Sequence, residues 1–302
     1  MVRDQIAAHE GDALISHEFF CSASTEQARR MVDQLAPATV HVIVTAREPL
    51  GLFTSSWQEH LKNKGTTPIE DYSREVSDDP GEIWNWRALD LGLVLERWGA
   101  VVPPELVHVI TPPDRGEPRV ELWRRFCSVL GVDVTVDESA GFANASMGVA
   151  EAETLRRVNA ELVDFGKAFD RGVWIRSFLA DGLLATRGGE PFWPGDDQIE
   201  DCRRRGEAAV ELIRSRGYDV VGDLGSLLVP DQLPDRRHPD SVTDTEVAEV
   251  AVDLVASLLS EVRERTQQRP RTGKPRQAGQ SVHTGQSGQS RARRLLDRLR
   301  RR

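Results

Sequence analysis

Two polar side chains, Arg47 and Ser55, have the types and spacing that best suit the binding of an anion in this sequence. The arginine comes shortly after a β-branched run, and the serine lies eight residues later, about one turn into a segment with helical periodicity. A guanidinium and a hydroxyl both donate hydrogen bonds to phosphate oxygens, and the first N–H groups of a helix attract the same charge. The pattern therefore predicts a phosphate site. The alternative is an arginine in a surface ion pair beside a solvated serine.

A buried strand and the helix after it must position these two side chains. Residues 40–45, VHVIVT, form an almost uninterrupted apolar run, which is typical of a parallel strand covered on both faces. Pro49 ends the strand region, because proline cannot continue a central ladder. From Leu50 the apolar residues recur at helical spacing. Such a strand–turn–helix unit places its turn at the carboxyl edge of the sheet, where ligands of open α/β folds bind.

The order of strand, Arg47, Pro49 and Ser55 resembles the 3′-phosphate-binding segment of the sulfotransferases that use 3′-phosphoadenosine 5′-phosphosulfate (PAPS). The resemblance covers residues 12–265, and segments 119–133 and 144–159 are similar to an actinobacterial branch of sulfotransferase-like proteins. It implies a P-loop-NTPase-like α/β fold in which Arg47 and Ser55 bind the 3′-phosphate. The implied reaction transfers a sulfuryl group from PAPS to a hydroxyl or amine of a small-molecule or glycan acceptor.

His17 and Glu18 are the residues that the resemblance implies as candidates for the catalytic base. They follow the apolar run Ala13–Ser16, which is similar to the preceding strand of the family, with the base at its end. A neutral imidazole or a carboxylate can accept the proton of the acceptor group. The alternatives are a structural histidine at a strand end and a glutamate that caps the next segment. The other two histidines near this region, His41 and His60, are interpreted as structural.

One part of the resemblance has no counterpart in this sequence. Sulfotransferases begin with a strand and a Lys-containing, Gly/Thr-rich loop that holds the 5′-phosphosulfate, whereas the residues before Asp12 read as the end of a helix. The similar string Lys64–Thr67 follows the Ser55 helix instead of a buried strand, which predicts a helix end and a turn. In the family the missing strand lies inside the sheet. We therefore expect an N-terminally incomplete sheet with a gap, and impaired transfer.

Three hypotheses for the function follow from this departure. The first is a sulfotransferase whose N-terminal strand and loop are missing from the chain as given. The second is a non-catalytic remnant that keeps weak affinity for a 3′-phosphoadenosine nucleotide through Arg47 and Ser55. The third is a helical interaction protein that binds acidic surfaces through a basic C-terminal tail.

Charge is distributed unevenly along the 302 residues. The net charge is −9, but residues 269–302 contain eleven Lys and Arg and one acidic residue, so −19 remains on residues 1–268. An acidic body argues against nucleic acid as a partner. Residues 267–290 contain few large apolar side chains, which predicts disorder. Residues 291–302 could form a short basic helix on an anionic surface, but three leucines give little apolar area, which favours a solvated tail. These patterns predict an α/β domain at 1–265 and a disordered Arg-rich tail at 266–302.

Cysteine spacing and hydropathy indicate the cellular compartment in which the protein is expected. The three cysteines are far apart and lack CxxC spacing, which indicates neither a disulfide framework nor a zinc site, and no metal is expected. No apolar run is long enough to span a bilayer, and no cationic-then-apolar leader stands at Met1. A cytoplasmic protein is therefore expected.

The remaining elements alternate in the first half of the chain and are helical after Asn144. The patterns predict a third strand at 107–111 and helices at 25–35, 83–98, 117–130, 148–165, 196–216 and 241–262. Ser24 and Gln27 form a capping box at the start of the first of these helices, and Gly131 closes the third. Two loops, 185–197 and 221–239, are candidates to cover a substrate. The alternation predicts a parallel sheet flanked by helices.

Overall fold

The computed structural model describes residues 2–114, 116–133 and 146–267, and all structural statements concern these residues. The chain divides into two compact units, Met1–Leu258 and Leu259–Arg302. Helix α10 (Asp244–Gln267) begins in the first unit and ends in the second. The predicted disordered tail falls mainly on residues 268–302, outside the described part, and the boundary predicted between 265 and 266 stays a prediction.

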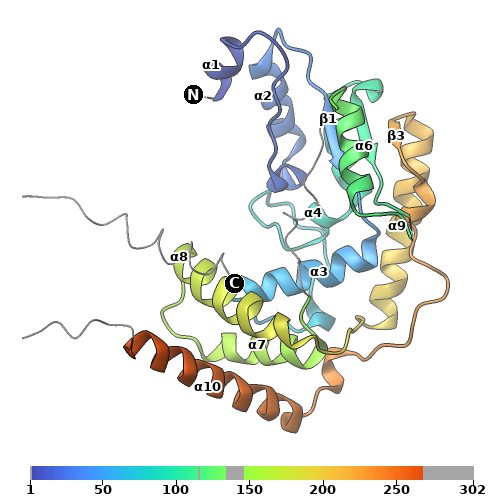
Figure 1. The fold of residues 1–302 in the computed structure, drawn as a ribbon. Helices are drawn as coiled ribbons and strands as arrows, with labels where there is room; N and C mark the ends of the chain where they lie inside the picture. The colour runs from blue at the N-terminus through green and yellow to red at the C-terminus, as the bar shows by residue number, and fades with distance from the viewer. Residues whose placement is uncertain (1, 115, 134–145, 268–302) are drawn as a thin grey trace, which may run out of the picture. The chain divides into compact units, whose positions relative to one another are not determined.

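A three-stranded parallel sheet forms the α/β part of the first unit, in the order β1-β2-β3 (Figure 1). Strand β1 (Val42–Thr45) pairs with β2 (Val107–Ile110) over all four residues, and β2 pairs with β3 (Asp219–Val221). The predicted parallel sheet flanked by helices is thus confirmed, as are its strands at 40–45 and 107–111. Strand β3 was not predicted, because three residues give too little periodicity to distinguish a strand from a loop.

The gap expected inside the sheet is absent among the three described strands. Strands β1 and β2 pair directly, and the ladder continues beyond β1, where the N–H of Ala46 donates to the carbonyl of Ile110 at 2.8 Å. On the other side of β2, the N–H of Thr111 donates to the carbonyl of Val221 at 3.1 Å. Neighbouring strands therefore satisfy each other's backbone groups with no place left between them for another strand. The expectation of a gap is wrong for this sheet.

One face of the sheet packs against α5 (Leu91–Gly99) and α9 (Asp196–Arg216). The side chains of this core are buried because alternate residues of a strand point to the same face. They include Val107 and Val109 from β2, Leu95 from α5, and Val210 and Ile213 from α9. Helix α6 (Val120–Leu130) lies along β2 and ends at Gly131, whose φ of 65° is the left-handed conformation that glycine adopts most easily.

A second core surrounds α3 (Pro49–Lys62), the helix that follows β1. Its apolar residues Leu50, Phe53, Trp57 and Leu61 are all buried, as their spacing predicts. They pack among α7 (Val149–Glu161), the π-helix η5 (Arg171–Leu184), α9 and the first-unit part of α10. Helix α3 therefore connects the carboxyl edge of the sheet to the helical half of the chain, and its buried side chains fix its position there.

The N-terminal segment contains α1 (Val2–Ala7), the 3-10 helix η1 (Glu18–Ser22) and α2 (Thr25–Leu35). Helix α2 has the predicted bounds, and both hydrogen bonds of its predicted capping box are present. The strand predicted at Ala13–Ser16 is wrong, since these residues have no regular structure. Leu14 is 57% exposed, so the run lacks the neighbouring strand and the covering side chains that a buried strand requires.

The remaining elements connect the two cores. They are η2 (Ile69–Asp71), α4 (Trp86–Leu89), η3 (Pro104–Leu106), α8 (Ala168–Asp170), η6 (Ala185–Arg187), η7 (Leu224–Leu227) and η8 (Pro239–Ser241). The single helix predicted at 83–98 is two helices, because the Asp90 side chain accepts from the N–H of Leu93 at 3.1 Å and begins α5. Within the described ranges, no helix has both the length and the apolar composition needed to cross a membrane.

Candidate functional site

Arg47 lies in the connection between β1 and α3, at the carboxyl edge of the parallel sheet. The backbone is fixed on both sides of it, by the Ala46 hydrogen bond to β2 and by the start of α3 at Pro49. The Arg47 side chain is exposed, and it makes no hydrogen bond or ion pair with any other residue of the described ranges. The arginine therefore has the placement that the sequence predicts, and the described structure provides no carboxylate partner for it.

Ser55 lies in the second turn of α3 and is half-buried. Its neighbour Ser56 points into the core, where its hydroxyl is 2.7 Å from that of Tyr72. Ser55 itself has no hydrogen-bond partner among the described residues. Gly51 precedes it by one helical turn and has no side chain to cover it. The Ser55 hydroxyl thus remains available as a donor, on the same strand–helix unit as Arg47.

Glu48 is a residue of this edge that the sequence analysis missed. Its carboxylate caps α3 by accepting from the N–H groups of Leu50 at 2.7 Å and Gly51 at 2.8 Å. The expectation that the first N–H groups of this helix attract an external anion is therefore wrong, because an internal carboxylate already holds two of them. Its position immediately before a proline was the available signal, since proline favours the first residue of a helix and Glu48 precedes it.

His17 and Glu18 lie at the start of η1, and both side chains are exposed. The Nδ1 atom of His17 accepts from the N–H of Phe19 at 3.2 Å, so the imidazole caps this short helix. The Nε2 atom has no such role. Because Nδ1 acts as an acceptor, the neutral ring carries its proton on Nε2, and the ring must change tautomer before Nε2 can accept a proton.

Three side chains hold η1 in place by donating to successive carbonyls. Trp98 Nε1 donates to Phe20 at 3.0 Å, Arg97 Nη2 to Cys21 at 2.7 Å, and Arg87 Nε to Ser22 at 2.8 Å. Buried donors of this kind fix backbone that belongs to no sheet or long helix. The segment with His17 is therefore positioned by α4 and α5, instead of by the strand that the sequence predicted.

A cavity of about 460 Å³ lies beside η1. Its lining is mainly apolar, and it is open to solvent. The lining residues include Phe19, Phe20, Ser22, Gln27, Met31, Asp79 and Trp98. Another cavity, of about 520 Å³, is lined by residues of α1 and α2. Neither of these two cavities includes Arg47 or Ser55 in its lining.

The structure thus groups the predicted residues in two pairs. Arg47 and Ser55 share the β1–α3 unit, whereas His17 and Glu18 share η1. No hydrogen bond or ion pair links one pair to the other within the described chain. The string Lys64–Thr67 follows the end of α3, where Lys64 has a φ of 72°, so the predicted helix end and turn are confirmed.

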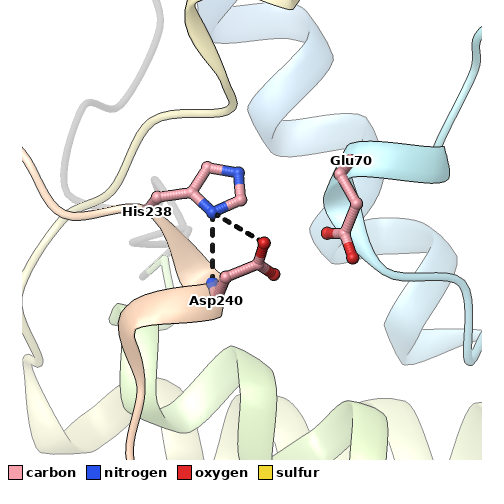
Figure 2. A group of neighbouring side chains, drawn as sticks. All are labelled: Glu70, His238 and Asp240. Atoms are coloured by element: carbon pink, nitrogen blue, oxygen red, sulfur yellow. Dashed lines mark hydrogen bonds and ion pairs between the residues drawn. The ribbon is translucent and has the colours of Figure 1, made fainter.

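A third group of polar side chains lies away from both pairs and was missed by the sequence analysis. Glu70, His238 and Asp240 offer one nitrogen and two oxygen atoms within 4.8 Å of one another (Figure 2). Burial raises the pKa of Glu70, and the nearby carboxylate of Asp240 raises it further. The residues come from η2 and η8, which are far apart in the sequence, so no local spacing could have identified them.

The two described cysteines with a resolved shift remain protonated thiols. Burial raises the pKa of Cys21 and raises that of Cys202 to about 12, so neither is a reactive thiolate at neutral pH. These two thiols are therefore poor candidates for a nucleophile. The sequence has no CxxC spacing either.

No protein-family model matches this chain, and no curated protein or solved structure matches it either.

Proposed function

We propose that this protein binds the 3′-phosphate of a 3′-phosphoadenosine nucleotide through Arg47 and Ser55, as in the sulfotransferases that it resembles. The observation that carries the proposal is the exposed Arg47 guanidinium at the carboxyl edge of a parallel sheet, without a carboxylate partner in the described chain. In a body that carries −19, an arginine that has no partner among the described residues at the carboxyl edge of the sheet is available for an anionic ligand.

The reaction class that this proposal implies is sulfuryl transfer from PAPS. An acceptor oxygen or nitrogen forms a bond to sulfur while the bond from sulfur to the 5′-phosphate oxygen breaks, and the nucleotide leaves as 3′-phosphoadenosine 5′-phosphate. The acceptor proton goes to His17 or, as the second candidate, to Glu18. The cavity beside η1, lined by Phe19 and Trp98, is where we place a hydroxyl or amine acceptor, since it adjoins the segment of the base.

Binding by this chain is expected to be weak. Glu48 occupies two N–H groups of α3, and its negative charge lies next to Arg47 in the sequence. No described residue replaces the loop that holds the 5′-phosphosulfate in the family, since Lys64 belongs to the turn after α3. A few charge-assisted hydrogen bonds then supply the affinity, which corresponds to a Kd of about 1 mM or weaker.

Calorimetric titration with a matched pair of nucleotides tests this proposal. The ligands are 3′-phosphoadenosine 5′-phosphate and adenosine 5′-diphosphate, which carry two phosphates each but differ in whether the 3′ position is phosphorylated. We expect the wild type to prefer the 3′-phosphorylated ligand and Arg47→Ala to abolish this preference. The control Arg214→Ala removes an exposed arginine from the last turn of α9 and should change nothing. Equal heats for both ligands would show that the protein does not recognise the 3′-phosphate.

A second candidate function is a nucleotide-binding protein without transferase activity. The direct pairing of β1 with β2 favours it, because the described sheet has no space for the strand that carries the 5′-phosphosulfate loop in the family. The two candidates differ in turnover. If the chain converts PAPS to 3′-phosphoadenosine 5′-phosphate in the presence of phenolic and amine acceptors, it is an enzyme, whereas binding without conversion supports the second candidate.

A further inference from the structure

Glu70, His238 and Asp240 converge from two separate segments. Glu70 is the second residue of η2, which follows the turn after α3, and the other two flank Pro239 at the start of η8. Figure 2 shows the Glu70 carboxylate facing the imidazole of His238 and the carboxylate of Asp240. The Nδ1 atom of His238 is 3.5 Å from Oδ2 of Asp240.

The donor atoms of this group suit one divalent transition-metal ion. Zinc is held by imidazole nitrogen and carboxylate oxygen at about 2.0–2.2 Å, usually with four ligands. Three protein ligands leave a position for water. Calcium and magnesium instead prefer sites made only of oxygen atoms, so the imidazole favours zinc over them. The separation of up to 4.8 Å between donor atoms allows small side-chain rotations to bring all three to one ion.

An orphaned oxygen provides an independent reason to expect a ligand here. The Oε2 atom of Glu70 is buried and accepts no hydrogen bond from an N–H or hydroxyl group of the described chain, and the carboxyl group that interacts with it is that of Asp240. One cation whose charge interacts with Glu70, Arg156, is committed elsewhere, since it donates to Glu153 at 2.7 Å and to the carbonyl of Thr66 at 3.2 Å. A buried carboxylate oxygen normally has a partner, and a bound cation would supply one.

The present hydrogen bonds of His238 do not prevent coordination. Its Nδ1 atom accepts from the N–H of Asp240 at 3.2 Å, which is at the long end for such a bond. An ion that binds the imidazole at this atom would replace a single long hydrogen bond. Asp240 is exposed and has freedom to turn its carboxylate toward the ion.

We propose that Glu70, His238 and Asp240 bind a zinc ion that fastens η8 to η2. Segment η8 directly precedes α10, whereas η2 follows the turn at the end of α3. The ion would therefore link two segments that come from the first and last thirds of the sequence. The proposed role is to hold the two segments together, with a water molecule as the fourth ligand. It does not depend on nucleotide binding at Arg47.

Zinc titration of the full-length, tag-free chain tests the site. Calorimetry is expected to give one zinc per chain, and the near-isosteric variants Glu70→Gln and Asp240→Asn should each lower the affinity at least tenfold. His238→Ala should abolish binding. Magnesium chloride at the same concentration should give no heat. Saturating zinc should raise the Tm of the wild type by about 5 °C or more and leave that of Glu70→Gln nearly unchanged.

The matched control addresses a pair of histidines away from the proposed site. His41 and His108 approach within 2.8 Å at the amino end of the sheet, and His108 also pairs with Asp219 at 2.7 Å. His41→Ala should therefore leave zinc affinity and stoichiometry unchanged. If His41→Ala loses the binding, or if Glu70→Gln binds zinc as the wild type does, the proposed site is wrong. An absence of zinc binding by the wild type would also overturn it.

Discussion

Replacing Glu48 with alanine should have two opposite effects, one on stability and one on ligand affinity. The carboxylate of Glu48 accepts from the N–H groups of Leu50 and Gly51 at 2.7 and 2.8 Å. Its loss leaves two donors at the start of α3 without a protein partner, and loss of an N-cap costs about 0.5–2 kcal/mol. For a chain of this size, we expect Glu48→Ala to lower the Tm by about 2–4 °C per kcal/mol lost.

The same substitution should strengthen the binding of a 3′-phosphorylated nucleotide. Two like unit charges about 6 Å apart in water repel each other by about 0.7 kcal/mol, so removing the Glu48 charge favours a phosphate dianion by roughly 1–1.4 kcal/mol. That corresponds to an affinity gain of about five- to tenfold. The freed N–H groups of α3 also become available to the phosphate, which acts in the same direction.

Thermal unfolding by circular dichroism and calorimetric titration with 3′-phosphoadenosine 5′-phosphate measure the two effects. The matched control is Ser24→Ala, which removes the cap of α2 but no charge near Arg47. It should lower stability by a similar amount and leave the nucleotide affinity unchanged. If Glu48→Ala binds the nucleotide more weakly than the wild type, Glu48 does not compete with the phosphate and the reasoning about this edge fails.

Two further predictions concern the packing around α3 and α7. Gly65→Ala would place a Cβ atom on the half-buried imidazole of His60, so we expect it to lower the free energy of unfolding, measured by urea denaturation, by about 1–3 kcal/mol. The control Gly166→Ala adds its Cβ atom in open space and should change this free energy little. Burial alone would raise the pKa of Glu153, but hydrogen bonds from Arg156 and Arg157 hold this pKa below its usual value. Glu153 therefore stabilises the fold above about pH 4.3, and this contribution is lost as pH falls through its lowered pKa. Glu153→Gln should be less stable than the wild type at pH 7 but not at pH 2; a difference that persists at pH 2 would contradict this.

Local signals predicted the elements whose ends are fixed by their own side chains. The capping box of Ser24 and Gln27 gave the start of α2, and Gly131 gave the end of α6. The run Ala13–Ser16 failed as a strand, because a short apolar segment becomes a strand only where another strand pairs with it. Pairing is a long-range property. The aspartate at 90 broke a predicted helix because capping by its side chain competes with continuing the helix.

The candidate residues divide in the same way. Arg47 could be identified because a strand, a proline and a helix in immediate succession determine where the turn between them lies. The capping role of Glu48 had one signal, the proline that follows it, but glutamate is not among the preferred N-cap residues, so this signal is weak. Glu70 and His238 could not be connected at all, because their proximity depends on how the helical core folds.

The affinity expected at Arg47 follows from what the described structure leaves available there. In the resembling family, the arginine–serine pair and the loop for the 5′-phosphosulfate hold the nucleotide, and the strand–turn–helix pattern of this chain predicts the helix N-terminus as a third anion-binding group. Here Glu48 holds the helix N-terminus, and β1 pairs directly with β2 where the loop-bearing strand was expected. Arg47 and Ser55 then contribute about 2–4.5 kcal/mol together, which is at best close to a millimolar Kd. A micromolar Kd for 3′-phosphoadenosine 5′-phosphate would mean that other residues bind the nucleotide.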